Sequence, residues 1–241
     1  MEEKRGHYHP LSIVGRDIIR IWSALGFEIA TGPEIETEHY NFDALNIPDN
    51  HPARDLWDTF WLKSKIKNQK TKIGENLLLR THTSPMQVRY MENNKPPFAI
   101  IVPGKTFRYE ATDATHEAQF HQLEGLMVGE NINLSNFKAI ILKFFEEFFG
   151  EKKEIRLRPS YFPFVEPGVE VDLRNPGEKK WLEIMGAGMV HPKVLEDLGI
   201  NHNKFQGFAF GMGLDRLAMI KYGIPDIRLF YSGDLRLVDQ F

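Results

Sequence analysis

Two arginines, Arg108 and Arg216, have the settings that an ATP-cleaving site requires. Arg216 follows an apolar run interrupted by Gly211 and Gly213, and it lies at the start of a helical pattern. Glycines let a backbone approach a flat ligand closely, and an arginine in the first turn of a helix can lie over a base or hold a phosphate. Arg108 belongs to a separate strand pattern, Phe107–Glu110. Because glycines also end ordinary strands, it is the pair of arginines on two strands that indicates an adenylate-forming site.

Further polar residues are expected to line the same site. Arg108 and Glu110 are two residues apart in one expected strand, as are Gln122 and Glu124 in the next, so each pair points to one face. An arginine there can bind a carboxylate or an α-phosphate through two hydrogen bonds, and an acid can orient it or a substrate amine. For Gln122 and Glu124 the alternative is a polar pair satisfied by its neighbours at a sheet edge. Beside Arg108 and Glu110, the pair favours a polar floor for a zwitterionic ligand.

An aromatic pair could hold the side chain of such a ligand. Phe162 and Phe164 are expected to share a face, and two rings favour an edge-to-face guest ring by about 0.5–1.5 kcal/mol beyond area burial. Ordinary core packing is the alternative for these two residues. Glu166 follows on the same face, and a carboxylate at the end of an apolar strand usually binds a cation or a hydrogen-bond donor. Its carboxylate is a suitable ligand for Mg²⁺.

The histidines near Arg108 do not predict a zinc site. His116 and His121 resemble the pair of a zinc-protease helix, but the second histidine comes one residue too late. On a strand the two side chains would also point to opposite faces.

The expected helices and strands place these residues on a sheet. Apolar residues at three- and four-residue steps predict a helix over 10–25, ended by Gly26. Other helices are expected at 39–45, at 85–93 with Ser84 as cap, at 135–149 with Ser135 as cap, and at 214–222. Strands are expected at Phe27–Ala30, Thr59–Leu62, Leu77–Leu79, Phe98–Val102, Lys105–Glu110, Phe120–Val128, Ile155–Arg158, Val169–Leu173, Trp181–Gly186 and Gly207–Gly211. Because strands come in runs, the pattern favours one α+β domain on an antiparallel sheet over a Rossmann fold.

The composition limits the other classes of function. The 241 residues contain no cysteine, which excludes disulfides, thiol catalysis and cysteine zinc sites. No apolar run is long enough for a membrane span and no signal peptide is visible, so a cytoplasmic protein is expected. A net charge of −3 gives no support for a general nucleic-acid surface. The lysine-rich segment 63–72 is the local exception, either as a solvated hairpin or as an RNA contact.

Several blocks, taken in order, resemble the class II aminoacyl-tRNA synthetases, and specifically the α subunits of bacterial phenylalanyl-tRNA synthetases. The three class II motifs are similar to Gly32-Pro33-Glu34, to Phe107–Glu110 with Phe120–Gly125, and to Gly211–Arg216. Blocks typical of that subunit match Asn41–Asn46, His51–Asp55, Leu79–Ser84, Tyr161–Phe164 and Gly188–Pro192. The resemblance covers residues 9–241 and implies a class II antiparallel sheet flanked by helices.

The resemblance also implies roles for individual residues. Arg108 would bind the α-phosphate of ATP and Arg216 the γ-phosphate side, and these two would be the catalytic residues. The ATP site would comprise Arg108, Glu110, His116, Phe120, Gly211, Gly213 and Arg216. The amino-acid site would comprise Trp57, His82, Ser84, Gln122, Glu124, Phe162, Phe164 and Ala209, with Ala209 beyond the para position of the ring. Glu166 would ligate Mg²⁺ together with residues of a β subunit.

The expected function is therefore that of a phenylalanine–tRNA ligase catalytic subunit, which forms phenylalanyl-adenylate from ATP and passes it to the tRNA(Phe) 3′ end. The resemblance implies an assembly of two α and two β subunits. The family's long N-terminal coiled-coil arm, which is not seen before His9, and the negative net charge also favour a need for a partner in tRNA binding, and the alternative is a self-sufficient homodimer paired through the Pro33 region. One alternative is a paralogue that forms an adenylate without charging tRNA or that activates another amino acid. The other is a non-catalytic assembly module, which would be expected to lose the phosphate arginines.

Overall fold

The architecture is known from a computed structural model that describes residues 6–54, 58–62 and 76–241. A large sheet has the spatial strand order β1 (Glu28–Ile29), β5 (Phe98–Phe107), β6 (Gln119–Gly129), β10 (Gln206–Gly213), β9 (Leu182–Val190), β8 (Val165–Arg174), β7 (Glu154–Phe162). All neighbours are antiparallel except β1 and β5, which are parallel. A small antiparallel sheet has the order β2 (Ile35–Thr37), β4 (Leu77–Leu79), β3 (Trp61–Leu62).

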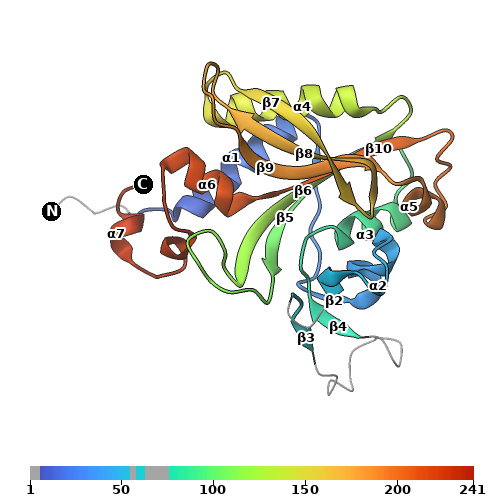
Figure 1. The fold of residues 1–241 in the computed structure, drawn as a ribbon, viewed down its shortest axis with the longest axis horizontal. Coiled ribbons are helices and arrows are strands. Elements are labelled where there is room, and N and C mark those ends of the chain that lie inside the picture. Colours follow the sequence, from blue (N-terminus) through green and yellow to red (C-terminus); the bar gives the residue numbers. More distant parts are fainter. Residues whose placement is uncertain (1–5, 55–57, 63–75) are drawn as a thin grey trace.

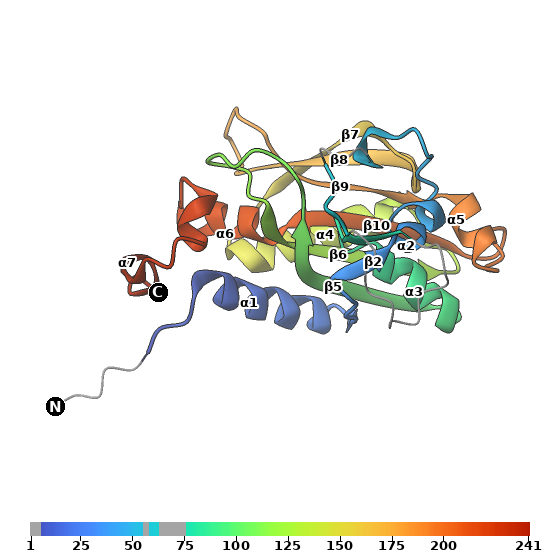
Figure 2. The ribbon, with the colours of Figure 1, turned by 90° about the horizontal axis from the view of Figure 1, so that it is seen from below.

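Helices lie on both faces of the large sheet (Figures 1 and 2). The α-helices are α1 (Pro10–Ala24), α2 (Glu38–Asn41), α3 (Pro85–Asn93), α4 (Leu134–Phe149), α5 (Pro192–Asp197), α6 (Leu214–Tyr222) and α7 (Leu235–Val238). The 3₁₀ turns are η1 (Asp43–Leu45), η2 (Pro52–Arg54) and η3 (Ile227–Phe230). Among the described residues, no helix is long and apolar enough to cross a bilayer.

The helices α1, α4 and α6 form the main core against one face of the sheet. Trp22 of α1 lies between Phe144 of α4 and Phe210 of β10, with ring centroids 4.9 Å apart in both stacked pairs. Each such pair contributes about 0.5–1.5 kcal/mol beyond the burial of its area. This face is therefore closed by packed aromatic rings.

The opposite face carries a second core and leaves room for a ligand. Ile100 and Val102 of β5 and Leu126 of β6 point to this face and pack with residues of α3 and α5. Side chains alternate along a strand, so Gln122 and Glu124 share the face with Leu126, whereas Leu123 points to the main core. The small sheet, α2 and α3 lie at the edge of this face (Figure 1).

The structure confirms some of the expected element ends and corrects others. The first helix ends just before Gly26, and the last predicted helix covers 214–222 and ends before Gly223, as the sequence predicted. Both glycines have a positive φ, which suits the end of a helix. The expected strands 98–102 and 105–110 are instead one strand, β5, which ends at Phe107. Ser135 is not the cap of α4, because Asn133 accepts from the backbone N–H groups of residues 135 and 136.

Candidate active site

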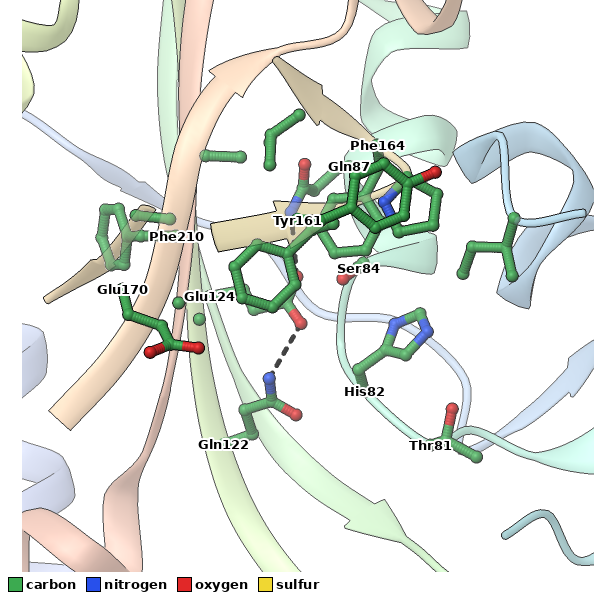
Figure 3. Close-up of a pocket in the computed structure, with 18 of the residues that line it drawn as sticks. Thr81, His82, Ser84, Gln87, Gln122, Glu124, Tyr161, Phe164, Glu170 and Phe210 are labelled. Atoms are coloured by element: carbon green, nitrogen blue, oxygen red, sulfur yellow. Dashed lines mark hydrogen bonds between the residues drawn. The ribbon is translucent and has the colours of Figure 1, made fainter. Parts of the chain in front are cut away.

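A cavity of about 670 Å³ lies on the open face of the large sheet. Its floor comes from β6, β9 and β10, and its walls come from the β7–β8 hairpin and the segment 81–87 (Figure 3). The described residues that line it are Ile47, His51, Asp58, Thr81, His82, Ser84, Gln87, Arg108, Glu110, Gln122, Glu124, Tyr161, Phe162, Pro163, Phe164, Val165, Glu170, Glu183, Gly186, Ala187, Ala209, Phe210 and Gly211.

Glu124 is the centre of the polar floor. Its carboxylate accepts hydrogen bonds from Gln87 Nε2 at 2.8 Å and from Gln122 Nε2 at 3.0 Å, as Figure 3 shows. Ser84 also hydrogen-bonds to it, so this serine supports the floor and makes no side-chain cap on α3. Burial outweighs these donors and raises the pKa of Glu124 to about 7. The carboxyl group is thus poised to ionise when a cation binds beside it.

We expect amino-acid binding to weaken as the pH falls below about 7. The protonated form of Glu124 cannot pair with an ammonium group, so the KM for the amino acid should approach a tenfold rise per pH unit below that point. ATP–pyrophosphate exchange between pH 5.5 and 8 would measure this dependence. Glu124→Gln should raise the KM at pH 8 and flatten the profile. A profile that stays unchanged in this variant would remove Glu124 from the binding of the ammonium group.

The same carboxyl group makes folding stability depend on pH in the opposite direction. Its folded pKa is raised above the unfolded value, so the free carboxyl binds protons more tightly in the folded state. The contribution of Glu124 to stability is therefore present at low pH and is lost as the pH rises towards about 7.

Two buried side chains of the cavity keep hydrogen-bonding capacity for a ligand. The Oε1 of Gln122, at the floor, has no hydrogen-bond partner within the described part of the chain. The ring of His82, in the wall, interacts with the backbone of Asn41 and has a second ring nitrogen for a ligand. Burial, with the nearby charge of Arg108, lowers the pKa of His82 to about 3, so its ring is neutral. A neutral imidazole can donate to a carboxylate, and the Gln122 carbonyl can accept from an ammonium group. Buried polar atoms of this kind cost about 1–3 kcal/mol each until a ligand satisfies them.

Arg108 lies beyond the end of β5 and still points into the cavity. Its Nε donates to the carbonyl oxygen of Thr81 at 3.2 Å, and its Cζ lies 5.0 Å from the centroid of the Phe120 ring. Burial lowers the pKa of Arg108, against the raising effect of Glu110, Glu124 and Asp58. The expectation that Arg108 and Glu110 share a strand is wrong, because β5 ends at Phe107. Both side chains nevertheless line the cavity.

The aromatic wall is a hairpin and not a single strand. Phe162 is the last residue of β7 and Phe164 lies in the turn before β8, with ring centroids 6.2 Å apart and an interplanar angle of 31°. Glu166 therefore does not share their strand, and its exposed side chain at the start of β8 is outside the set that lines the cavity. Ala209, on β10, is 3% exposed and lines the cavity as expected.

Other expected ATP residues lie outside the cavity wall. The described residues that line the cavity include Gly211 but not His116, Phe120, Gly213 or Arg216. The exposed His116 is hydrogen-bonded to Asp113 at 3.0 Å, in the loop after β5. Trp57 and the lysine-rich segment 63–72 lie outside the described residues.

Asp215 connects the strand of the polar floor with the helix of Arg216. It accepts from the backbone N–H of His121 at 2.6 Å and from the hydroxyl of Tyr231. Because Asp215 is 1% exposed, these bonds hold the start of α6 beside β6. Arg216 is half-buried in the first turn of this helix, near the end of β10.

Residues 1–241 match the family model of the class II core domain of tRNA synthetases. The phenylalanine–tRNA ligase alpha subunit of Dehalococcoides mccartyi is 54% identical, over 98% of this chain and 70% of that protein. The alpha subunit of Deinococcus radiodurans is 53% identical, over 98% of this chain and 70% of that protein. This chain belongs to the class II aminoacyl-tRNA synthetases, in the family of phenylalanine–tRNA ligase alpha subunits.

The predicted enzyme class is confirmed by the family model and these relatives, and the predicted fold class is confirmed also by a solved structure. The pyrrolysyl-tRNA synthetase of Desulfitobacterium hafniense has the same fold, with a TM-score of 0.69 and 20% identity over 95% of this chain and 75% of that one. The chain is thus an aminoacyl-tRNA synthetase, a ligase, with an α+β fold.

The carboxylates of this synthetase suit a magnesium ion that arrives with a nucleotide. Glu110, Glu170 and Glu183 line the cavity, but the described residues contain no group of three or more His, Cys, Asp or Glu arranged to hold a metal. Mg²⁺ commonly takes one or two protein carboxylates and completes its shell with phosphates and water. Glu170 and Glu183 both pair with Arg158, at 2.8 Å and 3.1 Å, so an ion bound there would share these carboxylates with the guanidinium group.

Sequence reasoning missed several cavity residues of the synthetase. Gln87 lies in α3 and reaches Glu124 across the floor, while Glu170 and Glu183 come from β8 and β9. The spacing Ser84-Pro85-Met86-Gln87 was a usable signal, because residues three apart on the first turn of a helix share a face. Glu170 and Glu183 gave no such signal, since their approach to the cavity depends on strand pairing.

Proposed function

We propose that phenylalanine is activated with ATP in this cavity and that different residues bind the ammonium group, the carboxylate and the ring of the amino acid. The observation that carries this proposal is one cavity with a polar floor, which includes the buried Glu124 and Gln122, and an aromatic wall. Glu124 and the Gln122 carbonyl would bind the ammonium group, and the neutral His82 would orient the carboxylate. Ser84 would serve the amino-acid site by holding the Glu124 side chain in place. Phe162 and Phe164 would contact the ring, with Ala209 at its end.

In this reaction the carboxylate of the amino acid is the nucleophile that attacks ATP. One carboxylate oxygen forms a bond to the α-phosphorus while the bond from that phosphorus to the bridging oxygen breaks, giving phenylalanyl-adenylate and pyrophosphate. A ribose hydroxyl at the 3′ end of tRNA(Phe) then takes the acyl group and releases AMP. The enzyme contributes by holding the reactants in line and by neutralising phosphate charge.

Arg108 is proposed to bind the α-phosphate, because the cavity holds its guanidinium beside the polar floor. Arg216 is proposed to bind the γ-phosphate side, with Glu110, His116, Phe120, Gly211 and Gly213 around the nucleotide. Arg216 is not among the described residues that line the cavity, so in this proposal the nucleotide would extend beyond the cavity to reach it. Trp57 remains part of the proposed amino-acid site.

Mg²⁺ would be held near the phosphates by Glu170 and Glu183, where it would neutralise charge on the leaving pyrophosphate. Glu166 is proposed as a separate ligand completed by the partner subunit, and its exposure supports a role at an interface. A cytoplasmic location follows from the proposed role in translation.

ATP–pyrophosphate exchange with each amino acid tests the proposed function. The chain, purified with its β subunit, should exchange with phenylalanine far faster than with tyrosine, leucine or methionine. Comparable exchange with another amino acid would indicate an adenylate-forming paralogue. No exchange with any amino acid would indicate an assembly module.

We expect the isolated chain to charge tRNA poorly and to require the β subunit in a two-α, two-β assembly. The relatives are named as alpha subunits, and the net charge of −3 disfavours a large tRNA footprint on this chain alone. Light scattering coupled to size-exclusion chromatography should give the tetramer mass only for the co-purified chains. Efficient charging of tRNA(Phe) by the isolated chain would contradict this assembly.

A further inference from the structure

The ring of Phe162 occupies the space where a side chain at position 186 would begin. Gly186 lies in β9, paired with Gly211 of β10 and Glu170 of β8, and it lines the cavity together with Phe162. A Cβ on Gly186 would lie 2.8 Å from Cζ of Phe162, and 3.3 Å and 3.4 Å from the two neighbouring ring carbons. Non-bonded carbon atoms normally lie 3.5–4.0 Å apart, so an alanine here cannot coexist with the present ring position.

The backbone gives no other reason for a glycine at this position. Gly186 is not among the glycines with positive φ, so an L-residue can adopt its conformation. The three atoms nearest to the added Cβ all belong to Phe162, and none belongs to the backbone. The Phe162 ring is therefore the group that would move. It would have to move away from β9, because the sheet prevents movement towards β9.

We propose that Gly186 is a specificity-determining position that sets the width of the amino-acid pocket through Phe162. The inference rests on the proposed activation of phenylalanine. Without a Cβ at 186, the Phe162 ring lies close against β9 and leaves the space in front of it for a substrate ring. A methyl group at 186 moves the Phe162 ring away from β9 and into the cavity, towards Phe164 and Ala209. The narrowed pocket then disfavours phenylalanine relative to unbranched or smaller aliphatic amino acids.

Gly186→Ala, assayed with its β subunit by ATP–pyrophosphate exchange, tests this inference. One methyl-sized group in an apolar pocket changes discrimination by about 10–200-fold, so kcat/KM for phenylalanine should fall within that range. The loss should lie in the KM for phenylalanine, with the KM for ATP unchanged, and the preference for methionine over phenylalanine should rise. Gly129→Ala is the matched control, because its Cβ would meet nothing nearer than 3.4 Å and it does not line the cavity. That variant should behave as the wild type.

Phe162→Leu separates an effect through the ring from damage to the sheet. If Gly186→Ala acts through Phe162, its penalty on phenylalanine should fall to less than about threefold in the Phe162→Leu background, since coupled residues are not additive. The double variant also decides the matter if Gly186→Ala alone does not fold, because removal of the ring removes the clash.

Three outcomes would overturn the inference: normal phenylalanine exchange by Gly186→Ala, an equal penalty in both backgrounds, or a double variant that does not fold. A wild-type enzyme that does not activate phenylalanine would instead refute the proposed function.

Discussion

Arg108→Ala should slow adenylate formation about 10²–10³-fold, equivalent to about 2.7–4 kcal/mol of transition-state stabilisation. The α-phosphorus becomes five-coordinate in the transition state, and negative charge grows on its oxygens. Arg108 is held at the cavity by its bond to the Thr81 carbonyl and lies over the Phe120 ring, so its charge is partly withdrawn from water. An arginine keeps its proton in proteins, and a fixed positive charge in such surroundings acts more strongly than in bulk water. Exchange kinetics at saturating ATP and phenylalanine measure this loss in kcat.

The exposed Arg20 provides a matched control for the loss of an arginine. Its side chain is 69% exposed and makes one ion pair with Asp17 at 3.9 Å, which contributes little to stability. Arg20→Ala should retain wild-type exchange, and both variants should keep the wild-type Tm. A near-normal exchange rate in Arg108→Ala would exclude this residue from the catalytic step.

The parts of the site that lie on regular elements were predictable from local sequence. Gln122 and Glu124 were expected on one face of a strand, and they do meet on the cavity side of β6 with a hydrogen bond between them. The two-residue period of a strand is enough for this prediction. The ends of α1 and α6 were equally predictable from the sequence, because apolar spacing and a terminal glycine define both helices.

The parts that depend on non-local geometry were not predictable. Phe162 and Phe164 were expected on one strand, but the chain reverses at Pro163 and Phe164, and the register of β7 against β8 shifts between residues 160 and 162. Ser84 is the N-cap residue of α3, as the sequence predicts, but its hydroxyl makes no cap hydrogen bond and is directed to the buried Glu124. Local sequence does not indicate this contact, because Glu124 lies on β6, on the other side of the cavity floor.

The absence of a side-chain cap bond from both Ser84 and Ser135 has one physical explanation. Both serines precede or begin helical patterns, and both satisfy the local preference for a cap. At the start of α4, Asn133 forms a capping box with Asn136 and leaves no role for Ser135. Local propensity thus gives the position of a helix start to within a few residues, and tertiary contacts decide which side chain is used there.

Ala209→Val should lower kcat/KM for phenylalanine about 10–200-fold, and Ala209→Gly should admit phenylalanines with a substituent at the para position. Ala209 is 3% exposed on β10, between Leu126 of β6 and Gly188 of β9, so its methyl group cannot turn away from the cavity. Two added methyl groups would fill the space that the end of the substrate ring requires. Removal of the methyl leaves room for a chlorine or a hydroxyl there. Exchange assays with phenylalanine, para-chlorophenylalanine and tyrosine measure both effects.

Ala99 offers the matched control for Ala209, because it lies on β5 of the same sheet and does not line the cavity. Ala99→Val and Ala99→Gly should leave the ratio of the rates for phenylalanine and para-chlorophenylalanine unchanged, even if they alter Tm. Ala209→Gly should bind tyrosine less well than para-chlorophenylalanine, since described apolar neighbours such as Leu126 offer no partner for a buried hydroxyl. If Ala209→Val keeps wild-type activity and discrimination, the substrate ring must bind elsewhere in the cavity, and the assignment of Phe162 and Phe164 as its contacts would fail with it.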